Sequence, residues 1–458
     1  MIKSARAYRA LTLVAALTLA PLVISGPAAS QALSEFGTAP DVPEGAVSED
    51  LSAALDTAFI RVFEDGSWGP DQGAALAEIA ASGDPRVAWI LTDMMRFTFN
   101  MSFDSALAEA AEGLLNIELT SDNAWNEITD HLIAWDIPAI PDYLRYKRAI
   151  FTSFVPGWEA LMVEGDIDWR LVSWGGVLID DRPFDDTDRR CNCIPAADNP
   201  PVLSADEATW PRDGDIVFGI EINGETRAYP RQIMEVREMV NDTLGGRDLA
   251  IPYCTLCGAA QAYFTDALPI GIERPVMRTS GLLIRSNKVM YDITSGSIFD
   301  TFRGNAVTGP LAERGLVLEQ ASVITTTWVE WRTAHPETTV LVQALALGRN
   351  PDFRNGRDAD GPIFPVGDVD PRLGVHDDVI GVIAASGTPW AFERGDALLA
   401  LAGGESIEVE NIRVVMDGGG LRAEDAGGGD LSSHEAFWFA WSQFYPETEL
   451  WTGAADAN

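Results

Sequence analysis

Two segments of the C-terminal half share the same order of short motifs, and this repetition constrains the fold more than any other feature. Each segment has an apolar stretch containing glycine, then a Gly-containing turn, then an Ala-aromatic pair. The matching residues are Val217–Ile220, Asn223-Gly224 and Ala228-Tyr229 in the first segment, and Val379–Val382, Ser386-Gly387 and Ala391-Phe392 in the second. Asn-Gly between apolar segments of period two is a strong hairpin signal.

A second pair of motifs follows each hairpin in the same order. Trp328 and Trp331 precede His335-Pro336-Glu337-Thr338, and Trp438 and Trp441 precede Tyr445-Pro446-Glu447-Thr448. Because two separate motifs agree in order, we interpret residues 213–341 and 377–452 as a degenerate internal duplication. Features present in both copies are best explained by packing. A C-x-x-C motif occurs only in the first copy, so we expect any chemistry to lie there.

The N-terminal part of the chain has a helical pattern from Ser48 to about Pro156. Apolar residues recur at spacings of three and four, and short Gly, Pro and Asp breaks separate the segments. The predicted fold class is therefore α+β, with a helical N-terminal domain followed by a β-rich, internally duplicated C-terminal region. The predicted boundaries are 1–32 for a signal peptide, 33–157 for the helical domain, 158–212 for a linker or wrapping segment, 213–341 for the first copy with the C-x-x-C motif, 342–376 for a connector and 377–458 for the second copy.

The first residues predict export from the cytoplasm. Lys3, Arg6 and Arg9 precede an apolar stretch from Leu11 to Ile24, and small residues follow at plausible cleavage positions. This is the pattern of a secretory signal peptide. No later stretch approaches the roughly 20 apolar residues that a spanning helix needs. We therefore expect a periplasmic or secreted protein with no membrane span after cleavage.

The charge of the chain restricts its partners. The formal net charge is −37 at pH 7. Nucleic acids and anionic lipid headgroups require positive patches for binding, so such an acidic protein is not expected to bind either. A small ligand or a protein partner is compatible with this charge, and the sequence specifies neither.

Four cysteines nominate the candidate site. Cys254 and Cys257 form the C-x-x-C motif, and Cys191 and Cys193 lie upstream in a C-x-C motif. An oxidising compartment favours disulfides. Cross-pairing of one upstream cysteine with Cys254 or Cys257 is expected, because a C-x-C disulfide is strained; such a bridge closes about 60 residues and stabilises by roughly 4 kcal/mol on the chain-entropy model.

Three other arrangements of these cysteines remain open. The four thiolates provide the number and type of ligands for one zinc or copper ion. Cys254 and Cys257 alone provide a redox-active pair, although no thioredoxin-like strand–C-x-x-C–helix pattern follows them. All four are inert buried thiols in the last alternative.

A set of polar residues near the C-x-x-C motif provides candidates for ligand binding. Two groups are involved, one after a short predicted helix and one in the stretch found only in the first copy. They are Arg237, Glu238, Asn241 and Asp242, and Ser280, Asn287, Tyr291, Asp292 and Ser297. Turn formation and cross-strand bonding are the favoured explanation of the second group. The functional interpretation is that they line a pocket beside Cys254 and Cys257.

Several of these motifs resemble the bacterial family called domain of unknown function 3179. The matching strings cover about residues 172–341 and include Asp198-Asn199-Pro200, Gly219–Pro230, Val240-Asn241-Asp242, Tyr253–Gly258, Ser280–Leu283, Met290–Asp292 and Ser295–Ser297. The chain departs from the family pattern at two places. Arg237-Glu238 stands where a His-Glu pair is usual, and Cys254-Thr255-Leu256-Cys257 stands where Cys-Pro-Leu-Cys is usual. The resemblance implies no known activity.

The sequence therefore supports three hypotheses of function. The first is a ligand- or metal-binding module centred on Cys254 and Cys257. The second is a thiol–disulfide redox enzyme that uses the same pair as its catalytic residues. The third is a structural or interaction protein whose cysteines are disulfide staples.

Overall fold

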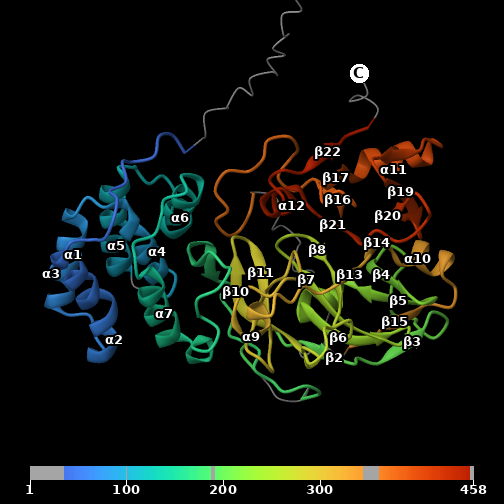
Figure 1. Cartoon of the computed structure of the whole chain (residues 1–458), viewed down its shortest axis with the longest axis horizontal. Coiled ribbons are helices and arrows are strands. Elements are labelled where there is room, and N and C mark those ends of the chain that lie inside the picture. The colour runs from blue at the N-terminus through green and yellow to red at the C-terminus, as the bar shows by residue number, and fades with distance from the viewer. Residues whose placement is uncertain (1–35, 99–100, 187–190, 344–360, 454–458) are drawn as a thin grey trace, which may run out of the picture. The chain divides into compact units, whose positions relative to one another are not determined.

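A computed structural model describes residues 36–98, 101–186, 191–343 and 361–453 (Figure 1). The predicted signal peptide lies outside the described residues. The chain divides into Met1–Gly37 and a compact unit of Thr38–Asn458, and everything below concerns the second unit.

Seven helices occupy the N-terminal part of this unit. They are α1 Glu49–Asp56, α2 Val62–Asp65, α3 Pro70–Ala81, α4 Ala88–Met95, α5 Met101–Leu115, α6 Ala124–Ala134 and α7 Tyr143–Phe154, with a π-helical segment, Thr57–Arg61, between α1 and α2. Polar side chains begin two of the helices: Ser48 Oγ accepts from the backbone N–H of Leu51 at 3.2 Å, and Asn123 Oδ1 accepts from that of Asn126 at 3.2 Å. Such caps satisfy donors that have no partner within the helix.

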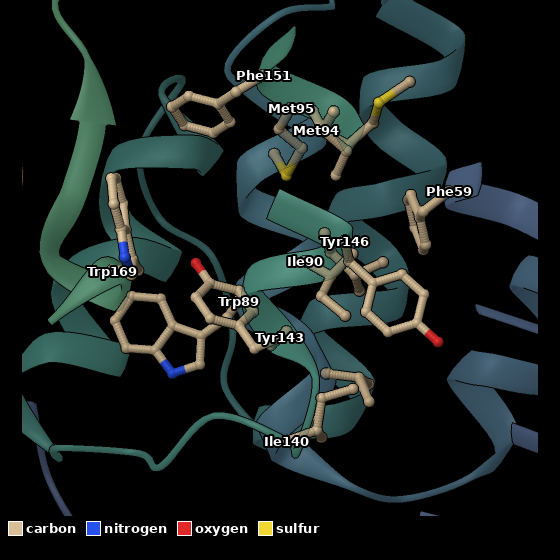
Figure 2. Packing of buried hydrophobic residues seen from close by; sticks show 14 of the residues in the cluster. Phe59, Trp89, Ile90, Met94, Met95, Ile140, Tyr143, Tyr146, Phe151 and Trp169 are labelled. Carbon is tan, nitrogen blue, oxygen red and sulfur yellow. The ribbon is translucent and has the colours of Figure 1, made fainter. Parts of the chain in front are cut away.

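The helices bury a large apolar core that continues into the strands. Figure 2 shows part of it, with Trp89 and Ile90 of α4 near Tyr143 and Tyr146 of α7. The indole N–H of Trp89 donates to the carbonyl of Ile137 at 2.8 Å, so its one polar atom is satisfied. The same core includes strand residues Leu282, Val289, Tyr291 and Ile298, among others. The helices therefore do not close a core of their own.

The described strands form five small sheets, and three of them hold the strands from Val172 to Leu341. The first is β1 Val172–Trp174, β10 Met277–Ile284, β11 Asn287–Asp292 and β12 Ile298–Asp300, in the order β1-β10-β11-β12. The second contains β13 Gln320–Ala321, β9 Ala262–Phe264, β7 Arg247–Cys254, β6 Met239–Leu244 and β2 Ala197–Asp198, in that order, with β8 Ala259–Ala260 paired to β7. The third is β14 Ile324–Thr327, β4 Ile216–Ile222, β5 Glu225–Pro230, β15 Thr339–Leu341 and β3 Val202–Ser204, in that order.

Two further sheets hold the remaining strands. The fourth is β21 Ser433–Phe437, β16 Asp378–Ile383, β17 Pro389–Glu393 and β22 Glu449–Trp451, in that order, and the fifth is β18 Ile407–Val409, β19 Ile412–Asp417 and β20 Gly420–Asp425. Short helices connect strands of these sheets: α8 Arg231–Arg237, α9 Gly309–Glu313, α10 Trp328–Ala334, α11 Arg394–Ala402 and α12 Trp438–Phe444.

The predicted fold class, a helical N-terminal domain followed by a duplicated β-rich region, is wrong. The strands belong to five small sheets with helices added, an arrangement of the β-propeller kind, rather than to two copies of one unit. The first sheet takes β1 from Val172–Trp174, before the first predicted copy, and its other strands from Met277–Asp300. Period-two patterns identify strands, but they do not specify which strands share a sheet, and here the first sheet packs against the helices.

Two of the five sheets nevertheless resemble each other. In the third and fourth sheets, a central hairpin is flanked by one antiparallel and one parallel strand. A Cβ atom added to Gly219 would lie 2.3 Å from the ring of Trp331, and one added to Gly381 would lie 1.9 Å from that of Trp441. Each glycine is therefore needed where a tryptophan ring crosses the hairpin.

Candidate functional site

The C-x-x-C motif forms a tight turn between two antiparallel strands. Cys254 is the last residue of β7, and its carbonyl accepts from the backbone N–H of Cys257 at 3.2 Å. Gly258, with φ of 63°, then leads into β8, whose Ala259 pairs with Cys254. The N–H of Phe437 in β21 donates to the Cys257 carbonyl at 2.9 Å. The turn is thus fixed from both sides, and no helix follows the cysteines.

Both thiols of this motif are buried and converge on one backbone oxygen. Cys254 and Cys257 are free cysteines with exposed fractions of 1% and 0%. Their sulfur atoms donate to the carbonyl of Ser286 at 3.7 and 3.5 Å, and the Cys257 sulfur also lies 3.5 Å from Oδ1 of Asn287. A shared acceptor brings the two sulfurs together in the dithiol state.

The surroundings shift the pKa values of the two thiols in opposite directions. Burial opposes ionisation of Cys254, but hydrogen bonds from the Cys257 thiol and from the backbone N–H of Lys288 outweigh it and lower the pKa of the Cys254 thiol. Burial, together with the neighbouring Cys254 sulfur, raises the pKa of the Cys257 thiol well above its usual value. Cys254 is therefore the member of the pair that ionises first.

A cavity of about 600 Å³ lies in front of Cys254. Its wall is mainly apolar, with a few polar groups: the lining residues are Gly175, Val177, Cys193, Ile194, Pro195, Glu235, Val236, Glu238, Cys254, Thr255, Leu256, Thr279, Gly281, Leu282, Leu283, Lys288, Val289, Ile363 and Phe364. Cys257 is not among them and lies behind Cys254. An apolar cavity with a small number of polar groups is typical of a small-molecule site.

Lys288 and Glu238 form the charged part of this wall. The Lys288 ammonium donates to the backbone carbonyl of Glu238 and lies 3.8 Å from Oε2 of its carboxylate. Burial lowers the pKa of Lys288, although the charges of Glu238 and of an ionised Cys254 oppose this change. Glu238 ends α8 with a φ of 50°, and its Oε1 accepts from Thr255 Oγ1 at 3.2 Å. A non-glycine residue in this conformation at a cavity wall is typical of functional sites.

The upstream cysteines form a disulfide with each other. Cys191 and Cys193 are bonded, with a Cα–Cα distance of 5.1 Å. The predicted cross-pairing with Cys254 or Cys257 is wrong, because those thiols are held by the β7–β8 turn and point to Ser286. The loop of the disulfide is fixed separately: Cys193 forms a β-bridge with Leu178, and the N–H of Leu178 donates to the Asn192 carbonyl at 3.1 Å. Cys193 nevertheless lines the same cavity as Cys254.

The four cysteines do not form one metal-binding group. Within the described ranges, the group of side chains with ligand atoms close enough to share an ion is Asp180, Cys191 and Cys193, whose ligand atoms lie within 4.8 Å of one another. Two of those three ligands are sulfurs already bonded to each other. The residues present thus offer zinc or copper a different set from the four thiolates that the sequence predicts.

The candidate ligand residues divide between the cavity and the structure around it. Glu238 lines the cavity, and Asn287 contacts the Cys257 sulfur behind it. Arg237 is buried next to Asp180 and Arg182; burial and then the charge of Arg182 lower the pKa of its guanidinium, while Asp180 raises it. Of the nine candidates, these three lie around the cavity or the charged groups beside it.

The other six candidates make structural hydrogen bonds. Asn241 bonds Asp198, and Asp242 accepts from Arg227 and Tyr229. Ser280 Oγ donates to the Val289 carbonyl across the β10–β11 hairpin, Tyr291 donates to the Asp180 carbonyl, Asp292 caps the turn that follows β11, and Ser297 accepts from the Leu311 N–H. The bonds of Asn241, Ser280 and Asp292 are cross-strand or turn contacts, as the sequence allows. Those of Asp242, Tyr291 and Ser297 join segments that are separate in the sequence.

Lys288 is the functional side chain that sequence reasoning missed, although the composition contains a signal for it. The chain has three lysines, Lys3, Lys147 and Lys288, whereas its other basic residues are arginines. Both lysines after the predicted leader are buried, and Lys147 pairs with Asp93 at 2.5 Å. A chain that otherwise uses arginine has a lysine at these two positions, where a compact ammonium with an adjustable pKa replaces a planar guanidinium.

These observations define the class of site as a buried dithiol on the wall of a mainly apolar cavity. A family model described as Protein of unknown function (DUF3179) matches residues 191–426, and the chain belongs to this family. The resemblance identified from the sequence is thereby confirmed. No curated protein and no solved structure matches the chain. None of the described helices has the length and apolar character that crossing a membrane requires.

Proposed function

We propose that this protein carries out thiol–disulfide exchange with a small disulfide bound in the cavity, with Cys254 as nucleophile and Cys257 as resolving thiol. The observation that carries this proposal is the position of the pair: Cys254 lines the cavity, and Cys257 lies directly behind it against the same carbonyl. We also propose that the protein works in the periplasm or outside the cell, where small disulfides persist.

The exchange takes place in two balanced steps. The Cys254 thiolate attacks one sulfur of the bound disulfide, so that a mixed disulfide forms and the first thiolate leaves. Cys257 then loses its proton to that thiolate and attacks the Cys254 sulfur, which releases the second half of the ligand. The second half leaves as a thiolate and takes up the proton that Cys254 had lost. The dithiol has then become a Cys254–Cys257 disulfide, and the ligand has become two thiols.

The surrounding groups favour these steps. The N–H of Lys288 and the Cys257 thiol stabilise the Cys254 thiolate by hydrogen bonds, which lowers the pKa of Cys254. The Lys288 ammonium attracts that thiolate and can donate a proton to a leaving thiolate. The two thiols and Lys288 are buried, so these electrostatic interactions act in a medium of lower dielectric constant than water.

The test uses 4,4′-dithiodipyridine, a small, neutral, aromatic disulfide whose released thione absorbs light. The native chain should release two equivalents of thione, one for each step. The Cys257→Ser chain should release one equivalent and retain a mixed disulfide on Cys254, and the Cys254→Ser chain should release almost none.

The alternative hypotheses predict other outcomes. A binding module without redox chemistry would leave the reagent intact in all three chains. A metal module would give bound zinc or copper(I) that survives dialysis and blocks thione release in the native chain. A staple of Cys254 to Cys257 in the purified protein would give no release until a reductant is added and removed. The first two results contradict the exchange proposal. The third contradicts it only if the chain still releases no thione after reduction, because a Cys254–Cys257 disulfide is also the product of exchange.

A further inference from the structure

A second cavity, of about 580 Å³, shares part of its wall with the cavity of Cys254. Residues of α4, α5 and α6 line it, together with Ile363 and Phe364, which line both cavities. Its volume is within the range of roughly 300–1,000 Å³ that is usual for small-molecule sites. There is no cysteine among its described lining residues. Any ligand of this cavity is therefore bound by other chemistry than that of the thiols.

Arg96, the residue that follows α4, contributes a cation to the wall of the second cavity. Its Nε–H donates to the carbonyl of Trp174 at 2.7 Å. Its guanidinium carbon lies 4.7 Å from the ring centre of Trp125, 5.3 Å from that of Phe364 and 5.4 Å from that of Trp174. Aromatic rings at such distances attract a guanidinium. The group is thus held by its Nε and by these rings, whereas its two terminal nitrogens make no hydrogen bond within the described residues.

Arg96 also has no carboxylate partner among the residues that the structure describes. Two other arginines of the helical part do have one: Arg86 pairs with Asp84 at 2.7 Å, and Arg170 pairs with Asp168 at 2.6 Å. Burial lowers the pKa of Arg96, and no nearby charge opposes this change. The chain has 69 acidic residues for 32 basic ones, so the lack of a carboxylate here does not follow from composition. The charge of Arg96 is therefore available to an anion that enters the cavity.

The rest of the wall restricts the kind of anion. Asp104 and Asp122 also line the cavity, and their charges oppose a doubly charged group such as a phosphate monoester. The two terminal nitrogens of a guanidinium match the two oxygens of a carboxylate, which carries a single charge. Met95, Ala108 and Ile363 add apolar surface to the wall. A carboxylate attached to an apolar body combines both requirements.

We propose that the second cavity binds a small monocarboxylate with an apolar body, and that Arg96 receives its carboxylate. The carboxylate oxygens accept from the two terminal nitrogens of Arg96, and the apolar body packs against side chains such as Met95 and Ile363. This site is separate from the dithiol, and the proposal does not rest on thiol–disulfide exchange.

The test uses 3-phenylpropanoate, with 3-phenylpropanamide as a matched probe of similar shape and no charge. Isothermal titration calorimetry of the full chain at neutral pH should give a Kd of about 1 mM or lower for the acid. The amide should bind at least about tenfold more weakly, because it cannot form the charge-assisted pair. Phenyl phosphate should also bind more weakly than the acid, and tighter binding of this dianion would overturn the assignment to a monocarboxylate.

Three variants locate the probe. Arg96→Met should weaken binding of the acid at least about tenfold. Arg148→Met removes the same charge from an exposed position of α7 and should leave the affinity unchanged. Ser105→Trp places a large side chain on the cavity wall and should also weaken binding at least about tenfold. Near-ultraviolet circular dichroism and the urea midpoint establish folding; because Ser105 is exposed, its variant tests the site even if Arg96→Met does not fold.

The contrary results are distinct from those of the exchange reaction. Equal binding of acid and amide, no binding of the acid to the native chain, or native affinity in Arg96→Met and Ser105→Trp would overturn the proposal. A loss of binding in Lys288→Met but not in Arg96→Met would place the carboxylate in the cavity of Cys254 and overturn it as well. Cys254→Ser should bind the acid like the native chain, so a failure of thiol–disulfide exchange leaves this site unaffected.

Discussion

The two cysteine pairs of this protein lie on one cavity but are held by opposite kinds of interaction. The turn of Cys254 and Cys257 is packed in an apolar cluster with Phe437 of the fourth sheet and Trp438 of α12. The segment of Cys191 and Cys193 is held by buried polar and ionic contacts, among them Arg278 with Asp198 at 2.6 Å. The difference teaches that the reduced pair is protected by burial, whereas the oxidised pair is positioned by charges that do not depend on its disulfide.

The largest loss of stability is expected when the ionic contacts that hold the segment of Cys191 and Cys193 are broken. Arg278 is fully buried and donates to the carbonyls of Arg182 and Pro183 and to Asp198, so it fastens the whole segment. Arg278→Met leaves Asp198 buried without its main cationic partner, and the free energy of unfolding should fall by about 3–5 kcal/mol. Urea denaturation measures this change.

An exposed ion pair provides the control for that variant. Arg332 and Asp213 lie at a similar distance, 2.5 Å, but their side chains are well exposed. Arg332→Met should change the free energy of unfolding by about 1 kcal/mol or less. Equal losses in the two variants would mean that the buried network does not hold the disulfide segment.

A smaller loss of stability is expected when the apolar packing of the turn of Cys254 and Cys257 is disturbed. Gly258 has a φ of 63°, and an added Cβ would lie 3.0 Å from the Phe437 ring. Gly258→Ala should lower the free energy of unfolding by roughly 1–3 kcal/mol, because it combines backbone strain with displacement of the ring. Gly224→Ala is the matched control: φ is 81° and nothing lies within 4 Å of the new Cβ, so strain of about 1 kcal/mol acts alone. A cost for Gly258→Ala no larger than for the control would show that the turn is not tightly packed.

The smallest effect on stability is expected from removal of the disulfide. Cys191 and Cys193 are two residues apart. On the chain-entropy model a loop this short contributes about 1.5 kcal/mol, far below a bridge that closes 60 residues. The Cys191→Ser/Cys193→Ser chain should therefore lose at most about 2 kcal/mol in urea denaturation. A loss of 4 kcal/mol or more would show that the pair is a structural staple.

The sequence predicted the position of the site better than its architecture. Spacing alone identified Cys254 and Cys257, because a C-x-x-C motif is local. The sequence could not predict which cysteine forms a disulfide with Cys193, since the geometry of the β7–β8 turn and the Leu178 bridge arises only in the folded chain. Lys288 was not predicted because the sequence Lys-Val-Met-Tyr is typical of an ordinary strand. Lys288 comes close to Glu238 only in the folded chain.

The fold class failed for a related reason. The motifs around Trp331 and Trp441 do occupy two similar sheets, yet Leu282 of β10 and Val289 of β11 belong to the same apolar core as the N-terminal helices. Apolar residues at period two fit a sheet that packs on helices as well as one that packs on another sheet. The sequence pattern could not distinguish between these two environments.

The central claim is that Cys254 is the reactive thiol of the pair and Cys257 is the protected one. Alkylation of the folded, reduced protein with iodoacetamide across pH 5 to 10, followed by peptide mapping, tests it most directly. Because the pKa of Cys254 is lowered, its modification should begin at a lower pH than that of an ordinary thiol, near 8.5, while Cys257 stays unmodified throughout. Modification of Cys257 first, or of both at the same pH, would contradict this account.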